Sequence, residues 1–211
     1  MSVATLAAEG RFRATLRPAL DLIVIHKRNP NPGQRVEDLS LNRGAVVFAV
    51  AAWQTYVESL TEAILAYLAP LPTDPAAGMY RLLAGRIRDQ IKRLNTPDAR
   101  NSIDLLALVG FDPTPAWTFT FEWERQVVRG HPSYTSNKTF GPGEAQKELD
   151  RWMLVRHKIA HGDTLPNDQE LVSGRSFHGE PRVKRENAAR CTSFFGALVA
   201  ATSAEAHATF P

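Results

Sequence analysis

The segment DLSLNRGAVVFAVAAWQTYVESLTEAILAYL (Asp38–Leu68) contains the longest helical pattern in the sequence. Between Ala45 and Trp53 it is apolar on nearly every side, whereas a helix at the surface of a bundle usually carries a single apolar stripe. Such a helix needs neighbours all around it. We therefore predict that this segment is the central, buried helix of the fold. It should end at APLPTDP (69–75), because a helix interior does not tolerate proline.

Helical periodicity also predicts helices on both sides of the central segment. Before it, apolar residues recur at helical spacing from Ala4 to about Lys27, and RNPNPGQ (28–34) then breaks the pattern. After it, the same spacing predicts four more helices, over residues 76–94, 96–109, 144–160 and 181–208.

Turn and cap signals separate these helices. In the helix 96–109 we expect Thr96 as the N-cap, Pro97 at the first helical position and Gly110 at the C-terminal cap. The polar stretch GDTLPNDQELVSGRSFHGE (162–180) is compatible with a small hairpin between the last two helices.

The segment FDPTPAWTFTFEWERQVVRGHPSYTSNKTFGPG (111–143) differs from the rest of the chain. We predict an ordered insertion that is pinned by its aromatic residues and has a flexible basic tip. The alternating run TFTFEW is compatible with a short strand, and WTFTFEWERQVV with one or two helical turns. Four bulky aromatic residues here are more typical of a core or dimer interface than of a base-stacking surface: Trp117, Phe119, Phe121 and Trp123.

These patterns predict an all-α fold, namely a helical bundle with an aromatic-rich loop insertion. The composition, 44% hydrophobic and 22% charged over 211 residues, is ordinary for a folded domain. We find no internal repeat and no sharp change in composition. Residues 1–211 are therefore expected to form a single domain.

The bulk composition also predicts a cytoplasmic protein. The single cysteine, Cys191, rules out an intramolecular disulfide framework, and its place on an apolar helical pattern is typical of a core thiol. The sequence has no apolar run of about 18 residues and no secretory signal pattern, so we expect no membrane segment. The net charge of +3 permits a polyanionic partner without requiring one.

The stretch RWMLVRHKIAHGD (Arg151–Asp163) gathers five basic residues, namely two arginines, two histidines and a lysine, toward the end of the helix 144–160. Cations in a last helical turn stabilise the helix by about 0.3–1 kcal/mol each, because they complement its negative end. Gly162 is expected to close the helix in the left-handed conformation. Part of this cluster is therefore explained by ordinary helix-end chemistry, and a purely structural bundle remains an alternative.

Two other kinds of site fit this stretch less well. His157 and His161 lie four positions apart, the spacing at which a helix presents two imidazoles to one zinc ion. However, Lys158 follows the first histidine, and no cysteine or acid at ligand spacing completes the set. A nucleophilic serine or cysteine site is not favoured either, because the sequence contains no G-x-S-x-G motif.

Phosphoryl chemistry on RNA without a metal fits the same residues better. An arginine grips a phosphate through two parallel hydrogen bonds and stabilises the charge that builds on it. A histidine side chain titrates near neutrality, so it can accept or donate the protons that RNA cleavage moves. Arg156 and His161 supply this pair, and His157 stands next to the arginine. The two residues are five positions apart, about 140° around an ideal helix, so they converge only if the helix ends or unwinds at His161.

The run RHKIAHG resembles the R-x4-6-H motif of HEPN domains, most closely the RiboL-PSP-HEPN type. In those families a polar residue commonly follows the arginine, and the motif lies near the end of a helix in an α-helical bundle. Here Arg156, His157 and His161 match the arginine, the polar residue and the histidine. The aromatic-rich segment AAWQTYVESLTEAIL (51–65) also resembles a helix that these domains often carry upstream.

The resemblance implies a homodimer that brings two copies of the motif together, and a metal-independent endoribonuclease that leaves a 2′,3′-cyclic phosphate. It implies Arg156, His161 and His157 as catalytic residues. We add Arg151 and Lys158 as RNA-binding residues, and we expect neither a metal nor a cofactor. RNA is then the substrate, and an antitoxin or another defence-system protein is an expected partner. The alternative is a non-catalytic HEPN module that binds RNA, a nucleotide or a protein.

Overall fold

The computed structural model describes residues 3–28, 35–125, 133–172, 174–175 and 181–211. Within these residues the chain is mostly helical, with six α-helices and two short antiparallel hairpins. The elements in chain order are α1 (Val3–Arg28), α2 (Arg35–Tyr67), α3 (Ala77–Arg93), α4 (Ala99–Ala107), a 3₁₀ turn η1 (Thr114–Ala116), β1 (Phe119–Arg125), β2 (Tyr134–Phe140), α5 (Pro142–His161), β3 (Gly174–Arg175), β4 (Pro181–Arg182) and α6 (Arg185–Thr209).

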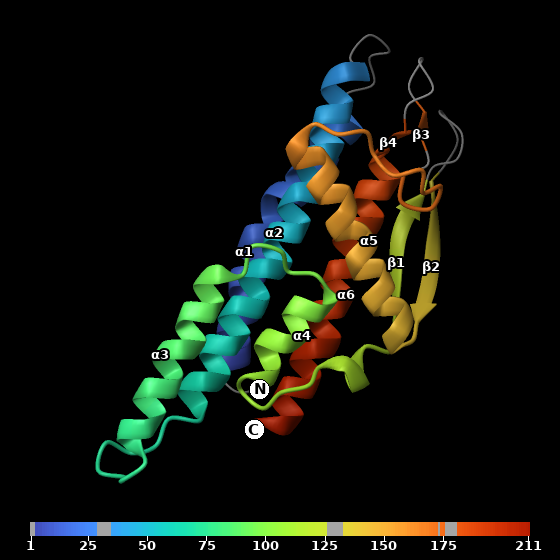
Figure 1. Ribbon diagram of the computed structural model, residues 1–211. Coiled ribbons are helices and arrows are strands. Elements are labelled where there is room, and N and C mark those ends of the chain that lie inside the picture. The colour runs from blue at the N-terminus through green and yellow to red at the C-terminus, as the bar shows by residue number, and fades with distance from the viewer. Residues whose placement is uncertain (1–2, 29–34, 126–132, 173, 176–180) are drawn as a thin grey trace.

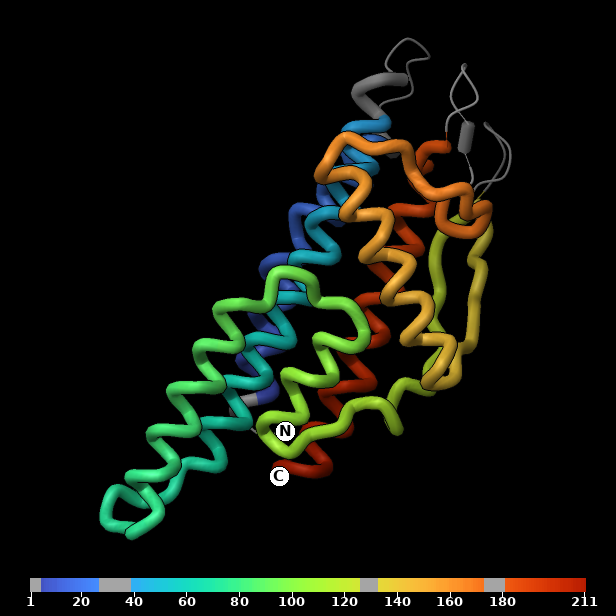
Figure 2. The backbone as a smooth tube through the Cα atoms, viewed as in Figure 1, coloured from blue at the N-terminus to red at the C-terminus, as the bar shows by residue number. Residues whose placement is uncertain are grey.

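The helix α2 is the centre of the bundle, as its apolar sequence predicts. It packs against α1, α5 and α6 (Figure 1). Within the run from Ala45 to Trp53, Phe48 is exposed, Val47 and Ala51 are half-buried, and the other residues are buried. Helices α1 and α2 lie side by side along most of their length (Figure 2). Gly44 allows this close approach, since a Cβ there would meet the Cδ1 of Leu22 at 3.0 Å.

A cluster of large aromatic side chains fills the middle of the bundle. Trp53, Tyr56 and Trp117 are fully buried, and each polar tip has a partner. The indole of Trp53 donates to the carbonyl oxygen of Pro97 at 3.1 Å, and that of Trp117 donates to the hydroxyl of Thr202 at 3.0 Å. Because a buried polar group without a partner costs about 1–3 kcal/mol, these bonds let aromatic residues occupy the core at little cost.

Within the segment 111–143, the described residues form a 3₁₀ turn and two paired strands, so the chain is mostly helical and the all-α prediction holds only in part. Strands β1 and β2 pair antiparallel from Phe119 opposite Phe140 to Arg125 opposite Tyr134. The inward face of the hairpin packs on α6, where Phe121 and Phe140 contact the ring of Phe194. The predicted alternation in TFTFEW therefore reports a strand with one buried face. The predicted basic tip falls on residues 126–132, which lie outside the described residues.

All six predicted helices are confirmed, but α4 and α6 begin three and four residues later than predicted. Helix α4 starts at Ala99, because the carboxylate of Asp98, not the hydroxyl of Thr96, accepts a hydrogen bond from the backbone NH of Asn101 at 2.7 Å. Helix α6 starts at Arg185, because Pro181–Arg182 pairs with Gly174–Arg175 as the small hairpin that the loop pattern allowed. None of the helices in the described ranges is long and apolar enough to cross a bilayer.

Candidate functional site

The motif residues lie at the C-terminal end of α5, which runs across one face of the bundle between α2 and the hairpin (Figure 1). The core-facing stripe of this helix includes Ala145, Leu149 and Trp152, all fully buried. Arg156 continues that stripe by one more turn, and its side chain is half-buried at the edge of the bundle. The same spacing that packs the helix therefore also places the arginine.

The two histidines of the motif lie on the solvent side of the same helix. The rings of His157 and His161 are both exposed, and their centroids are 4.3 Å apart. Leu154, with 46% of its surface exposed, precedes them by three and seven positions and therefore shares their face. The result is an open surface with two imidazoles and one exposed leucine.

Arg156 and His161 do not share a face within one chain. Helix α5 continues without a break to His161, so the five-residue spacing rotates the two side chains by about 140°. The helix ends after His161 but does not unwind before it. One chain therefore presents the arginine at the edge of the core and the histidines toward solvent.

Gly162 ends the helix as predicted. Its backbone is left-handed, with φ of 70°, and the NH of Asp163 donates to the carbonyl oxygen of Lys158 at 2.9 Å. This arrangement is a Schellman-type cap, which satisfies carbonyl groups that the helix end leaves open. The cap fixes the last turn that carries His161.

Gly162→Ala is expected to destabilise the protein by about 1 kcal/mol, because a Cβ strains the left-handed backbone. No atom lies within 4 Å of the Cβ position, so the cost is conformational and not a clash. Urea denaturation measures the effect. Gly143→Ala is the matched control: it lies near the start of the same helix, also in open space but without positive φ. It should leave stability unchanged or raise it, and an equal loss in both variants would contradict the cap.

Arg151 holds three carboxylates instead of facing solvent freely. Its guanidinium donates to both carboxylate oxygens of Asp168, at 2.6 and 2.7 Å, and to Glu148 at 2.8 Å and Glu170 at 3.1 Å. The predicted RNA-binding residue is thus committed to a structural network that ties α5 to the loop before β3. Lys158, the other residue predicted to bind RNA, pairs with Asp163 at 3.1 Å on the surface.

Beneath Arg151 lies a buried ion pair that sequence reasoning missed. The carboxylate of Glu148, with a 1% exposed side chain, accepts a hydrogen bond from Arg190 of α6 at 2.7 Å. Burial raises the pKa of Glu148, and the charges of Arg190 and Arg151 offset only part of that rise. An acid on the buried stripe of an amphipathic helix, three residues after Ala145, was the signal that a buried cation had to lie opposite.

The Arg151–Asp168 contact should make stability depend on pH. Burial alone would raise the pKa of Asp168, but hydrogen bonds from Arg151 and from the Leu171 backbone outweigh it and leave the pKa below its usual value. A carboxyl group with a lowered folded pKa stabilises the protein above its unfolded pKa and loses that effect as the pH falls through the folded pKa.

Asp168→Asn is therefore expected to destabilise the protein most at neutral pH, and by less and less below about pH 4, where the wild-type carboxyl is also protonated. Denaturation curves at several pH values measure the difference. Asp21→Asn, which removes a carboxylate that is 56% exposed on α1, is the control and should have little effect. A penalty for Asp168→Asn that stays constant down to pH 2 would be inconsistent with the ion pair.

Arg156 differs from its neighbours because no acid holds it. In the described part of the chain, its guanidinium makes no hydrogen bond and no ion pair, whereas Arg151 and Lys158 on the same helix both bind carboxylates. A half-buried guanidinium without a counter-charge favours an anionic ligand, and the planar fork fits a phosphate.

A metal site and a cysteine nucleophile find little support among the described residues. No group of three or more His, Cys, Asp or Glu side chains there lies in a position to hold a metal ion, so the His157–His161 pair has no third ligand of those kinds. Cys191 is fully buried, as its pattern predicts, and burial raises the pKa of its thiol, which makes it a poor nucleophile.

Comparisons with protein-family models, curated proteins and solved structures found no match. The chain is therefore assigned to no family. The geometry of Arg156, His157 and His161 is what carries a functional proposal.

Proposed function

We propose that this protein is a metal-independent endoribonuclease of HEPN type that acts as a homodimer. The observation that carries the proposal is that one helix end holds both the unpaired, half-buried guanidinium of Arg156 and the exposed imidazoles of His157 and His161. The negative end of a helix favours nearby cations, but that preference explains neither an arginine without a counter-charge nor two adjacent imidazoles.

The proposed reaction uses the RNA itself as the nucleophile. His161 takes the proton from a ribose 2′-OH, and the 2′-oxygen then forms a bond to the adjacent phosphorus while the bond from phosphorus to the 5′-oxygen breaks. A second imidazole, supplied by His157 or by a second chain, gives a proton to that 5′-oxygen. Arg156 stabilises the negative charge on the phosphate oxygens. The products are a 2′,3′-cyclic phosphate and a 5′-hydroxyl, with no change of oxidation state.

A dimer completes the site in this proposal. One chain separates Arg156 from His161 by about 140°, so the two reach one phosphate most simply when the arginine comes from one chain and the histidine from the other. The exposed Leu154 lies on the histidine face and supplies an apolar contact for such an interface. The motif-bearing face of α5 is therefore the proposed dimer interface.

RNA contact is assigned to Arg156 and, at the rim, to Lys158, whose surface ion pair with Asp163 is weak enough to open. Arg151 acts in this proposal as a positioning residue, because its donors already hold three carboxylates. A toxin or antiphage effector in the cytoplasm, restrained by a partner protein, is the biological role proposed.

The experiment that tests the proposal incubates the purified protein with RNAs of varied sequence in the presence of EDTA. We expect cleavage that persists in EDTA and products that carry a 2′,3′-cyclic phosphate, detected by their resistance to a phosphatase that removes only monoesters. Loss of activity in EDTA would contradict the metal-independent mechanism. Salt-sensitive RNA binding without any products would support the alternative, a non-catalytic module, which the separation of Arg156 and His161 within one chain also allows.

A further inference from the structure

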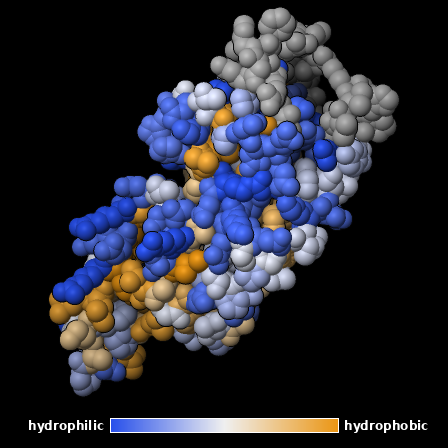
Figure 3. Space-filling model, turned by 45° about the vertical axis from the view of Figure 1, so that its right-hand side comes forward, coloured by the Kyte–Doolittle hydropathy of each residue, from blue (hydrophilic) through white to orange (hydrophobic). Residues whose placement is uncertain are grey.

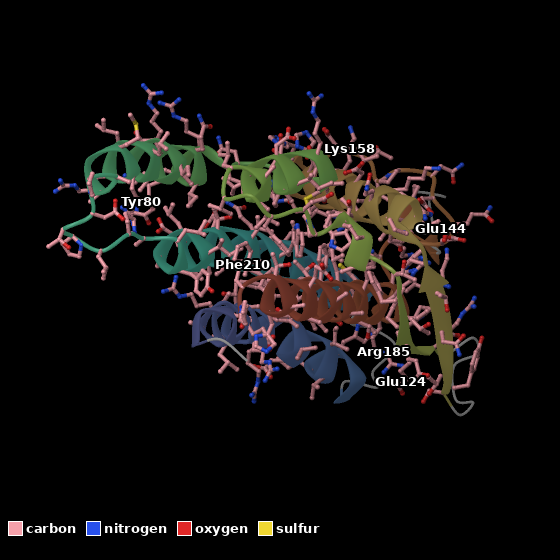
Figure 4. The ribbon with its side chains drawn as sticks, turned by 90° about the horizontal axis from the view of Figure 1, so that it is seen from below. Tyr80, Glu124, Glu144, Lys158, Arg185 and Phe210 are labelled. Carbon is pink, nitrogen blue, oxygen red and sulfur yellow. The ribbon has the colours of Figure 1, made fainter. Side chains whose placement is uncertain are left out.

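Helix α3 projects from the bundle together with the end of α2, and one of its sides has no neighbour (Figure 1). Only Ala84 of its 17 residues is buried. Tyr80 points from α3 toward α2, where its hydroxyl donates to the carbonyl oxygen of Leu65 and holds the two helices together (Figure 4). This bond ties the outer end of α3 to α2, while most of the surface of α3 stays exposed.

The exposed side of α3 carries large apolar residues beside a groove. Met79 is 63% exposed, Leu82 68% and Leu83 51%, and across the groove Leu108 at the end of α4 is 48% exposed. Two adjoining hollows, of about 450 and 490 Å³, run between the two helices; Leu108 lines both of them, and Leu83 lines the first. Figure 3 shows apolar surface gathered at this end of the molecule. Apolar surface of this extent beside a groove is typical of a binding site.

The charges around the groove are strongly unbalanced. Helix α3 has five cations and one acid. The acids that line the groove are already paired, Asp89 with Lys92 at 3.8 Å and Asp104 with Arg100 at 3.6 Å. Arg86 and Arg93, which also line the groove, have no carboxylate partner in the described part of the chain. The unpaired cations at an apolar groove favour an anionic, amphipathic ligand.

We propose that the α3–α4 groove binds an acidic amphipathic helix of a partner protein. Its leucine-type side chains would enter the hollows beside Leu83 and Leu108, and its acids would meet Arg86 and Arg93. A second copy of this chain fits poorly, because it would set one cationic α3 against another. A groove between two helices also matches the shape of a helix better than the plane of a membrane surface. This proposal is independent of the nuclease proposal, since it uses none of the motif residues.

The test is a display library of helical peptides with leucines at i, i+3, i+4 and i+7 and either acidic or basic residues on the opposite face, selected against the whole protein. We expect acidic sequences to be enriched and their affinity to fall at least about tenfold in Leu83→Ser/Leu108→Ser and in Arg86→Glu/Arg93→Glu. All four residues are exposed, so the variants should keep their fold. Arg13→Glu, a charge reversal on the exposed side of α1, is the matched control and should leave affinity unchanged.

Three outcomes would overturn the proposal. They are enrichment of basic peptides or of none, binding to phosphatidylserine vesicles in place of peptides, and loss of self-association in the groove variants. RNA cleavage measured on the same variants should stay at the wild-type level, so failure of this proposal and failure of the nuclease proposal remain distinguishable.

Discussion

Replacing His161 by alanine is expected to lower the rate of RNA cleavage by at least about a hundredfold, which is the lower end of what a general acid or base contributes. His161 is exposed at the end of α5, where its ring lies 4.3 Å from that of His157 and makes no hydrogen bond or ion pair with the described residues. The variant should therefore fold as the wild type does, so lost activity reports lost chemistry. His157→Ala should cost less, because the proposal gives that ring a supporting role.

Arg156→Ala is expected to have an effect as large as that of His161→Ala, because phosphate stabilisation by a single preorganised donor is worth about a hundredfold or more. Arg156→Lys keeps the charge but loses the two-pronged donor, so it should recover only part of the activity. Single-turnover rates measure both. Arg13→Ala, which removes a 77% exposed arginine from α1, is the control that should retain full activity. Full activity of Arg156→Ala would remove the arginine from the mechanism.

Arg190→Ala is expected to destabilise the protein by up to about 3–5 kcal/mol, the usual cost of leaving a buried charge without its partner, because Glu148 then keeps only the partly exposed Arg151 as a cation. Arg190 is 6% exposed and binds Glu148, which is 1% exposed; it also donates to the backbone carbonyl oxygen of Glu170. Its guanidinium lies 5.4 Å from the ring centre of Trp123 in β1. The loss would therefore loosen contacts between α6, α5 and the hairpin together.

The double variant Glu148→Leu/Arg190→Met separates the ion pair from simple loss of packing. It removes both charges and keeps the apolar volume, so it should recover much of the stability lost in Arg190→Ala. Guanidinium denaturation measures all three proteins. An exposed pair elsewhere, Arg100 with Asp104 at 3.6 Å, is the comparison, and Asp104→Asn should change stability by less than about 1 kcal/mol. A single Arg190→Ala variant as stable as the wild type would contradict the assigned role of the pair.

The central position of α2 was predictable because its run from Ala45 to Trp53 leaves no polar side for solvent. The packing face of α1 was harder to predict from the sequence. Its periodic large residues Leu6 and Leu20 are 47% and 42% exposed, while the small residues Ala8 and Ala19 are buried. A periodic pattern reports which side chains are hydrophobic, whereas close packing of two helices favours small side chains at the contact.

The candidate site was predictable at its helix end but not in its surroundings. The left-handed conformation of Gly162 and the exposure of the histidines follow from local sequence. The carboxylates that bind Arg151 do not, because Asp168 lies 17 positions away in a loop and no local pattern links the two. Only the folded structure therefore shows that carboxylates bind Arg151 and that no described carboxylate binds Arg156.

A subunit-mixing experiment tests the composite site most directly. The inactive variants Arg156→Ala and His161→Ala are co-refolded so that their chains exchange, and RNA cleavage is measured on the mixture. If the site takes Arg156 from one chain and His161 from the other, each mixed dimer contains one intact site, and about a quarter of the wild-type activity should return. A mixture as inactive as its two parents, under conditions in which the wild type cleaves RNA as a dimer, would contradict a site shared between two chains.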